Sequence, residues 1–483
     1  MVASKLISKY NGMSKQVKAS IWYTFSNVLV KSVALLTTPV FARLMSKEEY
    51  GTFTVFQSWF NIIFIFSTLN MFMSGYTKGL LVYKGKEKEF TSSLLGLSTV
   101  ITFILLGVYC VNMSFWSGVL ELQPHLVIAL FLELLLMPAY DLWAARKRFD
   151  YEYTQFVAVS VVMSISGLLI GVVAVIMSKH NVEARVYADV FSKCVISLVL
   201  FILIFIGGKS FFNKEFWKYT LRFNLPLIPH YLSNYVLNQS DRLMIAKMVG
   251  KEEAATYSIA YTISTMMNLI VTAINNAVTP YLYKSINSND TKDIKKITRP
   301  IFLLIAVLCV LTMILAPEII YVFAGKAYME AIYVIPPISL SVYCIFVYAM
   351  YSSIEYYHQK TMLISIATSA SALANLLLNY VFIKMFGYMA AGYTTLVCYA
   401  ALAVLHYLFY KRVLKECMDN SPSFYDDRLI LIIGIALVGI MIILLFVYQW
   451  IIIRYGILLI IAIVCFFNRK KIINSLVSLK IKE

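Results

Sequence analysis

Basic side chains stand within several long apolar segments of this sequence, and two of them are suited to binding a ligand. Lys31 lies near the centre of the first segment and Arg242 lies within the seventh. A cation at the centre of a membrane helix costs about 2.5–3.5 kcal/mol on insertion scales, so it faces water, a partner or a ligand. Lys31 has no acid one helical turn away, and adjacent positions such as Asp241 and Arg242 do not face each other on a helix. We interpret both cations as binding groups for an anion, either a multiply charged diphosphate or a carboxylate.

Uncharged polar side chains accompany these cations. They recur at steps of three and four residues in several apolar segments, which places them on one face of each helix. We expect these faces to line an aqueous cavity, and their amide and phenol groups suit a sugar. The alternative is hydrogen bonding between packed helices, at about 0.6 kcal/mol per bond. The predicted cavity residues are Asn27, Asn61, Asn234, Asn238, Tyr261, Asn268 and Asn375.

The elements that carry these residues are predicted to be membrane helices. The chain is 60% hydrophobic and 14% charged, with a mean hydropathy of +0.76, far more apolar than soluble domains. Segments of about 18 to 25 apolar residues, each long enough to cross a bilayer, recur along the chain. We expect an all-α integral membrane fold with about 14 transmembrane helices. The range is 12 to 14, because the last two segments are separated by a very short turn and Arg454 stands inside the fourteenth.

The net charge of +17 reflects membrane topology. With the N-terminus inside, the tails and even-numbered loops carry 30 lysines and arginines, against 9 in the odd-numbered loops. This asymmetry follows the positive-inside rule and predicts that both termini are cytoplasmic. The basic loops are also suited to contact with anionic membrane lipids, and we expect no nucleic-acid partner.

A repeated segment predicts two halves. SKEEYGTFTVF at 46–56 matches GKEEAATYSIA at 250–260 at a fixed offset of 204 residues. The two copies stand six predicted helices apart, which indicates parallel six-helix repeats around a central cavity. We predict an N-terminal half over 1–210, a C-terminal half over 211–415, and two further helices with a basic cytoplasmic tail over 416–483.

Catalytic and metal-binding signatures are absent from the sequence. The longest predicted loops have about 17 residues, and no phosphate-binding loop, zinc-protease pair or nucleophile elbow occurs. The seven cysteines show no metal-like pairing and are predicted to pack as small apolar residues. We therefore expect no catalytic residue, no metal and no cofactor, and a transporter in preference to a membrane-bound polymerase or glycosyltransferase.

Four stretches resemble one family of transporters. They are PVFARLMSKEEYGTFTVF (39–56), ARKRFDYEYTQF after the fourth helix, FNLPLIPHYLSNYVLNQSDRLMIAKMVGKEEAATYSIAY (223–261) and APEIIYVFAGKAYMEAIYVIPPI (316–338). Together they resemble Wzx-type flippases, in the polysaccharide transporter branch of the multidrug/oligosaccharidyl-lipid/polysaccharide exporter superfamily. The resemblance covers essentially the whole chain.

The resemblance implies a flippase for undecaprenyl-diphosphate-linked oligosaccharide repeat units. Such a protein works by alternating access in the bacterial inner membrane, for O-antigen or capsule assembly. Lys31 and Arg242 would then meet the diphosphate, with Arg43 and Lys247 at the outer mouth of the cavity. The remaining partners expected are membrane lipids and the polysaccharide polymerase machinery, and the flippase itself is expected to be a monomer.

Such transport implies coupling to a proton or sodium gradient or to the membrane potential. The acids that could carry it are Glu133, Asp189, Asp241 and Glu355, with structural ion pairing as the alternative for each. Lys193 stands one turn after Asp189, which favours a local ion pair. Glu318, near the outer end of its helix, is expected to be solvated. A cation-coupled multidrug exporter and a lipid II or teichoic-acid exporter are the alternative functions.

Overall fold

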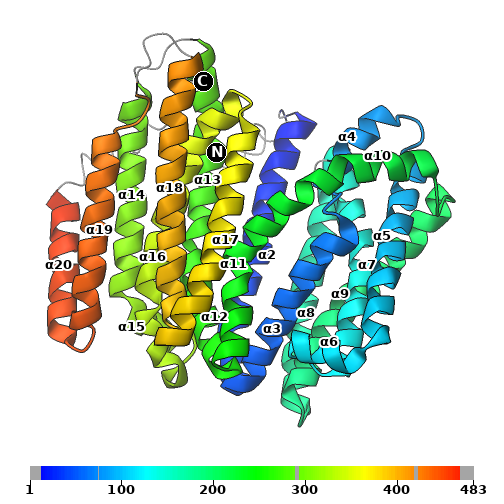
Figure 1. The fold of residues 1–483 in the computed structure, drawn as a ribbon, viewed down its shortest axis with the longest axis horizontal. Coiled ribbons are helices and arrows are strands. Elements are labelled where there is room, and N and C mark those ends of the chain that lie inside the picture. The colour runs from blue at the N-terminus through cyan, green and yellow to red at the C-terminus, as the bar shows by residue number, and fades with distance from the viewer. Residues whose placement is uncertain (1–11, 13, 74, 289–292, 418–422, 468–483) are drawn as a thin grey trace. The chain divides into compact units, whose positions relative to one another are not determined.

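The computed structural model describes residues 12, 14–73, 75–288, 293–417 and 423–467. These residues are helical or irregular, with no strand among them, as predicted for an all-α membrane protein (Figure 1). The chain divides into two compact units, Met1–Tyr235 with Gly250–Ala255, and Val236–Val249 with Thr256–Glu483. The predicted domain limits at 210 and 415 stay predictions, and most of the predicted basic tail lies outside the described residues.

The first unit is built on six long helices. They are α2 (Lys15–Leu44), α3 (Lys47–Thr68), α5 (Glu87–Val111), α7 (Pro124–Phe149), α8 (Tyr153–Met177) and α9 (Asn181–Gly208). Shorter helices join or follow them, namely α4 (Gly75–Val82), α6 (Met113–Leu120), α10 (Lys214–Asn224) and the 3-10 turn η1 (Leu225–Leu227). Helices α11 (Ile228–Met248) and α12 (Lys251–Thr265) begin in this unit and continue into the second.

The second unit continues with further long helices. They are α13 (Met267–Asn287), α14 (Ile294–Ile314), α16 (Ile335–Tyr357), α17 (Thr361–Phe386), α18 (Ala390–Cys417), α19 (Asp427–Val447) and α20 (Ile451–Phe467). Two short elements, α15 (Ala316–Phe323) and η2 (Lys326–Tyr333), precede α16. Within the described residues, eleven helical spans are long and apolar enough to cross a membrane. The other three predicted spans correspond to α3, α11 and α20.

The same helix pairs pack together in both units. In the first unit α7 packs on α9, α8 on α9, α5 on α7 and α3 on α5. In the second unit α16 packs on α18, α17 on α18, α14 on α16 and α13 on α14. These are the corresponding helices of each set of six, so the packing has the internal repeat that the duplicated segment predicts.

The repeated segment begins a helix in each copy. Ser46 caps α3 by accepting from the Glu49 amide, and the Glu49 side chain accepts from the Ser46 amide. The second apolar segment predicts a helix over about 52–75, whereas this capping box starts the helix at Lys47. The predicted continuation to 75 is also wrong, because Leu69 and Asn70 turn the chain with positive φ after Thr68.

The two copies of the repeated segment touch each other. A side-chain carbon at Gly51 would lie 1.9 Å from the carbonyl oxygen of Lys251, and both residues belong to the first unit. Only a residue without a side chain allows this close approach.

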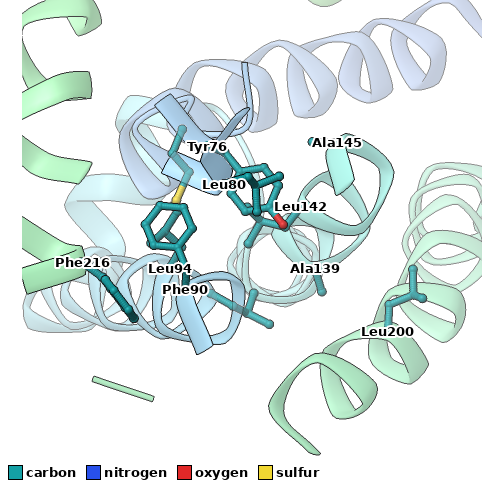
Figure 2. Close-up of a cluster of buried hydrophobic side chains, with 11 residues drawn as sticks. Tyr76, Leu80, Phe90, Leu94, Ala139, Leu142, Ala145, Leu200 and Phe216 are labelled. Atoms are coloured by element: carbon teal, nitrogen blue, oxygen red, sulfur yellow. The ribbon is translucent and has the colours of Figure 1, made fainter. Parts of the chain in front are cut away.

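An aromatic core fixes one end of the first unit (Figure 2). Tyr76 of α4, Phe90 of α5 and Phe216 of α10 are buried together against Leu142 of α7. The Tyr76 hydroxyl lies 2.6 Å from the hydroxyl of Thr91, so its polar end is satisfied within the core. This core therefore joins the short helices α4 and α10 to the long ones.

Candidate functional site

A buried charge cluster lies between α7 and α9 in the first unit. The Lys193 ammonium lies 2.7 Å from a carboxylate oxygen of Glu133 and 2.6 Å from one of Asp189. Arg185, one turn before Asp189, contacts its other oxygen at 3.3 Å. The local pair of Asp189 and Lys193 is therefore confirmed. Lys193 has in addition an interhelical partner, Glu133, whose side chain is 1% exposed.

Aromatic rings and an amide tie this cluster to α2 and α3. The Arg185 guanidinium lies 4.2 Å from the ring centroids of both Phe41 and Phe53. The Gln57 amide nitrogen lies 3.5 Å from Asp189. Cation–π contacts stabilise a desolvated guanidinium by about 2 kcal/mol. The two cations and two carboxylates balance, so these four groups are suited to joining helices.

The predicted binding residues of α2 and α3 lie outside this cluster. Asn27 and Lys31 are exposed on α2, and Asn61 is half-buried on α3. Lys31 makes no ion pair with any described residue, and its binding role stays a prediction. Arg43 is exposed in the last turn of α2.

A buried carboxylate organises the second unit. Asp241 of α11 is 1% exposed. It accepts hydrogen bonds from the Tyr257 hydroxyl at 2.5 Å, from Thr395 at 2.9 Å and from the Asn379 amide at 2.6 Å. These three donors are neutral and come from α12, α18 and α17. Asp241 of α11 is therefore held by donors from three other helices, and its hydrogen-bond partners among the described residues include no cation.

Neighbouring polar groups extend this network. The buried Asn375 amide contacts Thr395 at 3.3 Å, and its oxygen accepts from Ser240 and Asn379 at 3.3 and 3.2 Å. Asn379 also accepts from Thr394. Asn375 is thus part of the Asp241 network, where its hydrogen bonds join α11, α17 and α18.

Arg242 points to different partners from Asp241. Its guanidinium donates to the Gln239 side chain and lies 4.7 Å from the Tyr261 ring centroid. The Tyr261 hydroxyl donates to Asn238 at 2.9 Å, which fixes the ring beneath the cation. Arg242 is half-buried, and its Nε is buried without a hydrogen-bond partner among the described residues. One donor of the guanidinium therefore has no partner among the described residues.

The other predicted residues of this region are dispersed. Asn234 contacts the His230 ring at 3.4 Å within the first unit. Asn268 is half-buried at the start of α13, where its side-chain oxygen has no hydrogen-bond partner among the described residues. Lys247 is exposed in the last turn of α11.

A second carboxylate of this unit is paired with histidine. Glu355 of α16 and His406 of α18 are both fully buried, with 2.8 Å between Oε1 and Nδ1. Tyr348 stacks on the imidazole at 5.6 Å. Glu133 and Lys193 occupy the corresponding helices, α7 and α9, of the first unit. Both units therefore place an acid opposite a nitrogen base, which is a lysine in the first unit and a histidine in the second.

The expectation for Glu318 is wrong. Its carboxylate forms a two-point contact with Arg454 of α20, at 2.5 and 2.6 Å. Arg454 is 3% exposed, so it requires a buried or half-buried counter-ion. Both residues stand out in the sequence as charges within or near apolar segments, but no spacing rule joins α15 to α20. Sequence reasoning also missed Thr395 and His406, because their partners lie on other helices. It missed Arg185 as well, although Asp189 stands four residues later on the same helix.

The described residues hold no group of three or more metal-ligating side chains of the His, Cys, Asp and Glu types. The arrangement instead offers buried carboxylates and a half-buried guanidinium backed by an aromatic ring. Such groups can bind and release cations and anions during transport.

Comparison with known proteins agrees with this architecture. A family model described as "Polysaccharide biosynthesis protein" matches residues 17–286, and a MatE model matches residues 226–381. A Haemophilus influenzae protein described as an uncharacterized membrane protein is 22% identical over 365 residues, which cover 74% of this chain and 88% of that protein.

Solved structures share the fold. Lipid II flippase MurJ in an inward closed conformation has a TM-score of 0.67 at 16% identity, covering 94% of this chain and 100% of MurJ. An inward-facing multidrug resistance MATE transporter of the MOP superfamily has a TM-score of 0.60 at 15% identity, covering 80% of this chain and 96% of that chain.

Proposed function

Because the chain belongs to the polysaccharide biosynthesis protein family within the MOP superfamily of transporters, we propose that it flips undecaprenyl-diphosphate-linked oligosaccharide repeat units. The movement is from the cytoplasmic to the outer leaflet of the bacterial inner membrane, for O-antigen or capsule assembly. Alternating access moves the cargo, and the basic loops keep both termini in the cytoplasm.

The environment of the Arg242 guanidinium is the observation that supports an anionic cargo. The Tyr261 ring and Gln239 orient the guanidinium, while its Nε has no partner among the described residues. A planar guanidinium suits two oxygens of a phosphate group. Lys31 is the corresponding cation of the first unit, where it is exposed on α2. Arg43 and Lys247 serve at the outer mouth.

Asp241 is our candidate for the coupling residue. The three hydrogen bonds to its carboxylate come from neutral donors, whereas Glu133 and Asp189 are matched by Lys193 and Arg185. A buried carboxylate without a cationic partner gains most from binding a proton or a sodium ion. Glu355, whose partner is the imidazole of His406, is the second candidate, for a proton.

Arg242→Ala tests the cargo assignment in a strain that lacks the chromosomal copy. A charge-assisted hydrogen bond contributes about 1.5–3 kcal/mol, so the flipping rate should fall by roughly 10- to 150-fold. The measurements are surface polysaccharide and the lipid-linked oligosaccharide retained inside the cell, at matched protein levels. Lys384→Ala, which removes a cation from the last turn of α17, is the control and should leave both unchanged.

The outcomes separate the candidate functions. Loss of surface glycan with retained lipid-linked units supports the proposal, and partial recovery with Arg242→Lys indicates that charge alone is used. Normal glycan in Arg242→Ala overturns the cavity assignment. Normal glycan in the deletion strain overturns the function itself. A deletion phenotype limited to drug susceptibility would indicate a multidrug exporter, and rescue of cells depleted of their lipid II flippase would indicate a lipid II exporter.

Asp241→Asn tests coupling in vesicles with an imposed gradient. We expect the variant to lose the stimulation of transport by a sodium or proton gradient while it still binds the lipid-linked cargo. Stimulation equal to wild type would remove Asp241 from the mechanism. In that case Glu355→Gln is measured in the same vesicles.

A further inference from the structure

Helix α10 crosses the ends of α4 and α5 in the first unit (Figure 1). It buries one stripe at four-residue spacing, Phe216, Thr220 and Asn224. Figure 2 shows the Phe216 ring beside Phe90 in the aromatic core, with the ring centroids 5.3 Å apart. This face of the helix is therefore occupied by the protein itself.

Hydrogen bonds fix the orientation of α10. The Asn213 side chain caps its first turn by accepting from the amides of Glu215 and Phe216. The indole nitrogen of Trp217 donates to the backbone oxygen of Ser93 at 2.9 Å. Because these bonds hold both the first turn and one side of the helix, the face opposite the buried stripe has a fixed orientation.

That opposite face carries a row of three cations. Lys214, Lys218 and Arg222 are exposed and follow one another at four-residue spacing, about 6 Å apart along the helix axis. None of them forms an ion pair with any described residue. The single acid of the helix, Glu215, faces Tyr83 instead. No acidic side chain of α10 therefore offsets the positive charge of this row.

An apolar row lies directly beside the cations. Trp217, Leu221 and Leu225 follow the same four-residue spacing, and together with the basic row they line a hollow of about 620 Å³. Phe212, which is 60% exposed, and Pro226 complete it. A basic row next to an apolar row is the pattern of a helix at the boundary between lipid headgroups and acyl chains.

We propose that this hollow binds an anionic glycerophospholipid. The phosphate of the headgroup lies against Lys214, Lys218 and Arg222, and an acyl chain lies along Trp217 and Leu221. A row about 12 Å long is wider than one phosphate, so neighbouring anionic headgroups also contact it. The apolar row distinguishes this surface from a site for a soluble anion. The site is independent of the molecule that the protein transports.

Quenching of Trp217 fluorescence tests the proposal in the full-length protein. The protein is reconstituted in phosphatidylcholine vesicles that contain a fixed fraction of either brominated phosphatidylglycerol or brominated phosphatidylcholine. The signal of Trp217 is the difference between the wild-type protein and Trp217→Phe. We expect stronger quenching by the brominated phosphatidylglycerol, and a smaller difference between the two lipids at high salt.

A triple variant identifies the binding groups. Lys214→Gln/Lys218→Gln/Arg222→Gln should weaken the preference for phosphatidylglycerol by about fivefold per cation, on the order of a hundredfold in total. The charge-retaining variant Lys214→Arg/Lys218→Arg/Arg222→Lys should keep it. A control variant neutralises three exposed lysines on a neighbouring segment, Lys84, Lys86 and Lys88, and should also keep it.

Three results would overturn the proposal. They are equal quenching of wild-type Trp217 by the two brominated lipids, an undiminished preference in the triple Gln variant, and displacement of the phosphatidylglycerol signal by inorganic pyrophosphate. The last result would identify a site for free phosphate. If Trp217→Phe disturbs folding, native mass spectrometry measures the phosphatidylglycerol retained by the purified wild-type and triple Gln proteins. Retention by the wild type that the triple Gln variant loses supports the proposal, and equal retention overturns it.

Discussion

Removing the ammonium of Lys193 tests how much the paired charges of the buried cluster in the first unit contribute to stability. In the wild-type protein this ammonium lies 2.7 Å from Glu133 and 2.6 Å from Asp189. The side chains of both acids are buried, with exposures of 1% and 9%. Lys193→Met keeps most of the apolar stem and deletes the charge. Asp189 then retains Arg185 at 3.3 Å, whereas Glu133 loses its ion pair.

The expected cost follows from the unpaired Glu133 carboxylate. Breaking a buried ion pair by removing one partner destabilises a protein by about 3–5 kcal/mol, chiefly through the charge left behind. Replacing both partners by neutral groups avoids this penalty. Lys193→Met/Glu133→Gln should therefore be more stable than Lys193→Met alone, by up to about 3 kcal/mol. This difference appears as an interaction free energy between the two sites in a double-mutant cycle.

Denaturant or thermal unfolding of the purified proteins in one detergent measures this coupling. Wild type, Lys193→Met, Glu133→Gln and the double variant complete the cycle. Lys84→Met, which removes an exposed lysine, reports the effect of the substitution type. Equal stabilities of Lys193→Met and the double variant would refute the argument, as would a Lys193→Met variant as stable as Lys84→Met.

Further predictions concern two other contacts. Gly51→Ala should lower the melting temperature and the yield of folded protein, because its new carbon would lie 1.9 Å from a backbone oxygen. Gly107→Ala, at a position with open space around it, should be neutral or stabilising, as helix propensity favours alanine by about 1 kcal/mol. Arg454→Met should destabilise the attachment of α20, with easier proteolysis there, and adding Glu318→Gln should restore part of the loss. Full protection in Arg454→Met would show that the ion pair contributes little.

Contacts within one helix were the part of the candidate site that the sequence could predict. The pair Asp189 and Lys193 follows from a spacing of four residues, and the separate directions of Asp241 and Arg242 follow from adjacency. Both are geometric properties of an α-helix. The apolar segments predicted the helices in the same way, since their length is set by the bilayer.

Contacts between helices required the structure. Nothing in the sequence relates Asp241 to Asn379 and Thr395, because they lie more than 130 residues away in the chain. Glu318 looked solvated since its partner, Arg454, belongs to a helix whose position no local pattern reveals. A buried cation or acid in a membrane helix is itself the signal that such a partner exists.

The approach of Gly51 to Lys251 also sets a sequence of events during synthesis. The two residues are 200 positions apart in the chain. Synthesis proceeds at about 5–20 residues per second. Roughly 10–40 s therefore pass between the synthesis of Gly51 and that of Lys251, which covers it. The nascent first unit therefore stays unfinished on this side while its other helices insert. A chain released before residue 250 exposes the surface around Gly51, whereas a chain extended through Ala255 contains every residue of that unit.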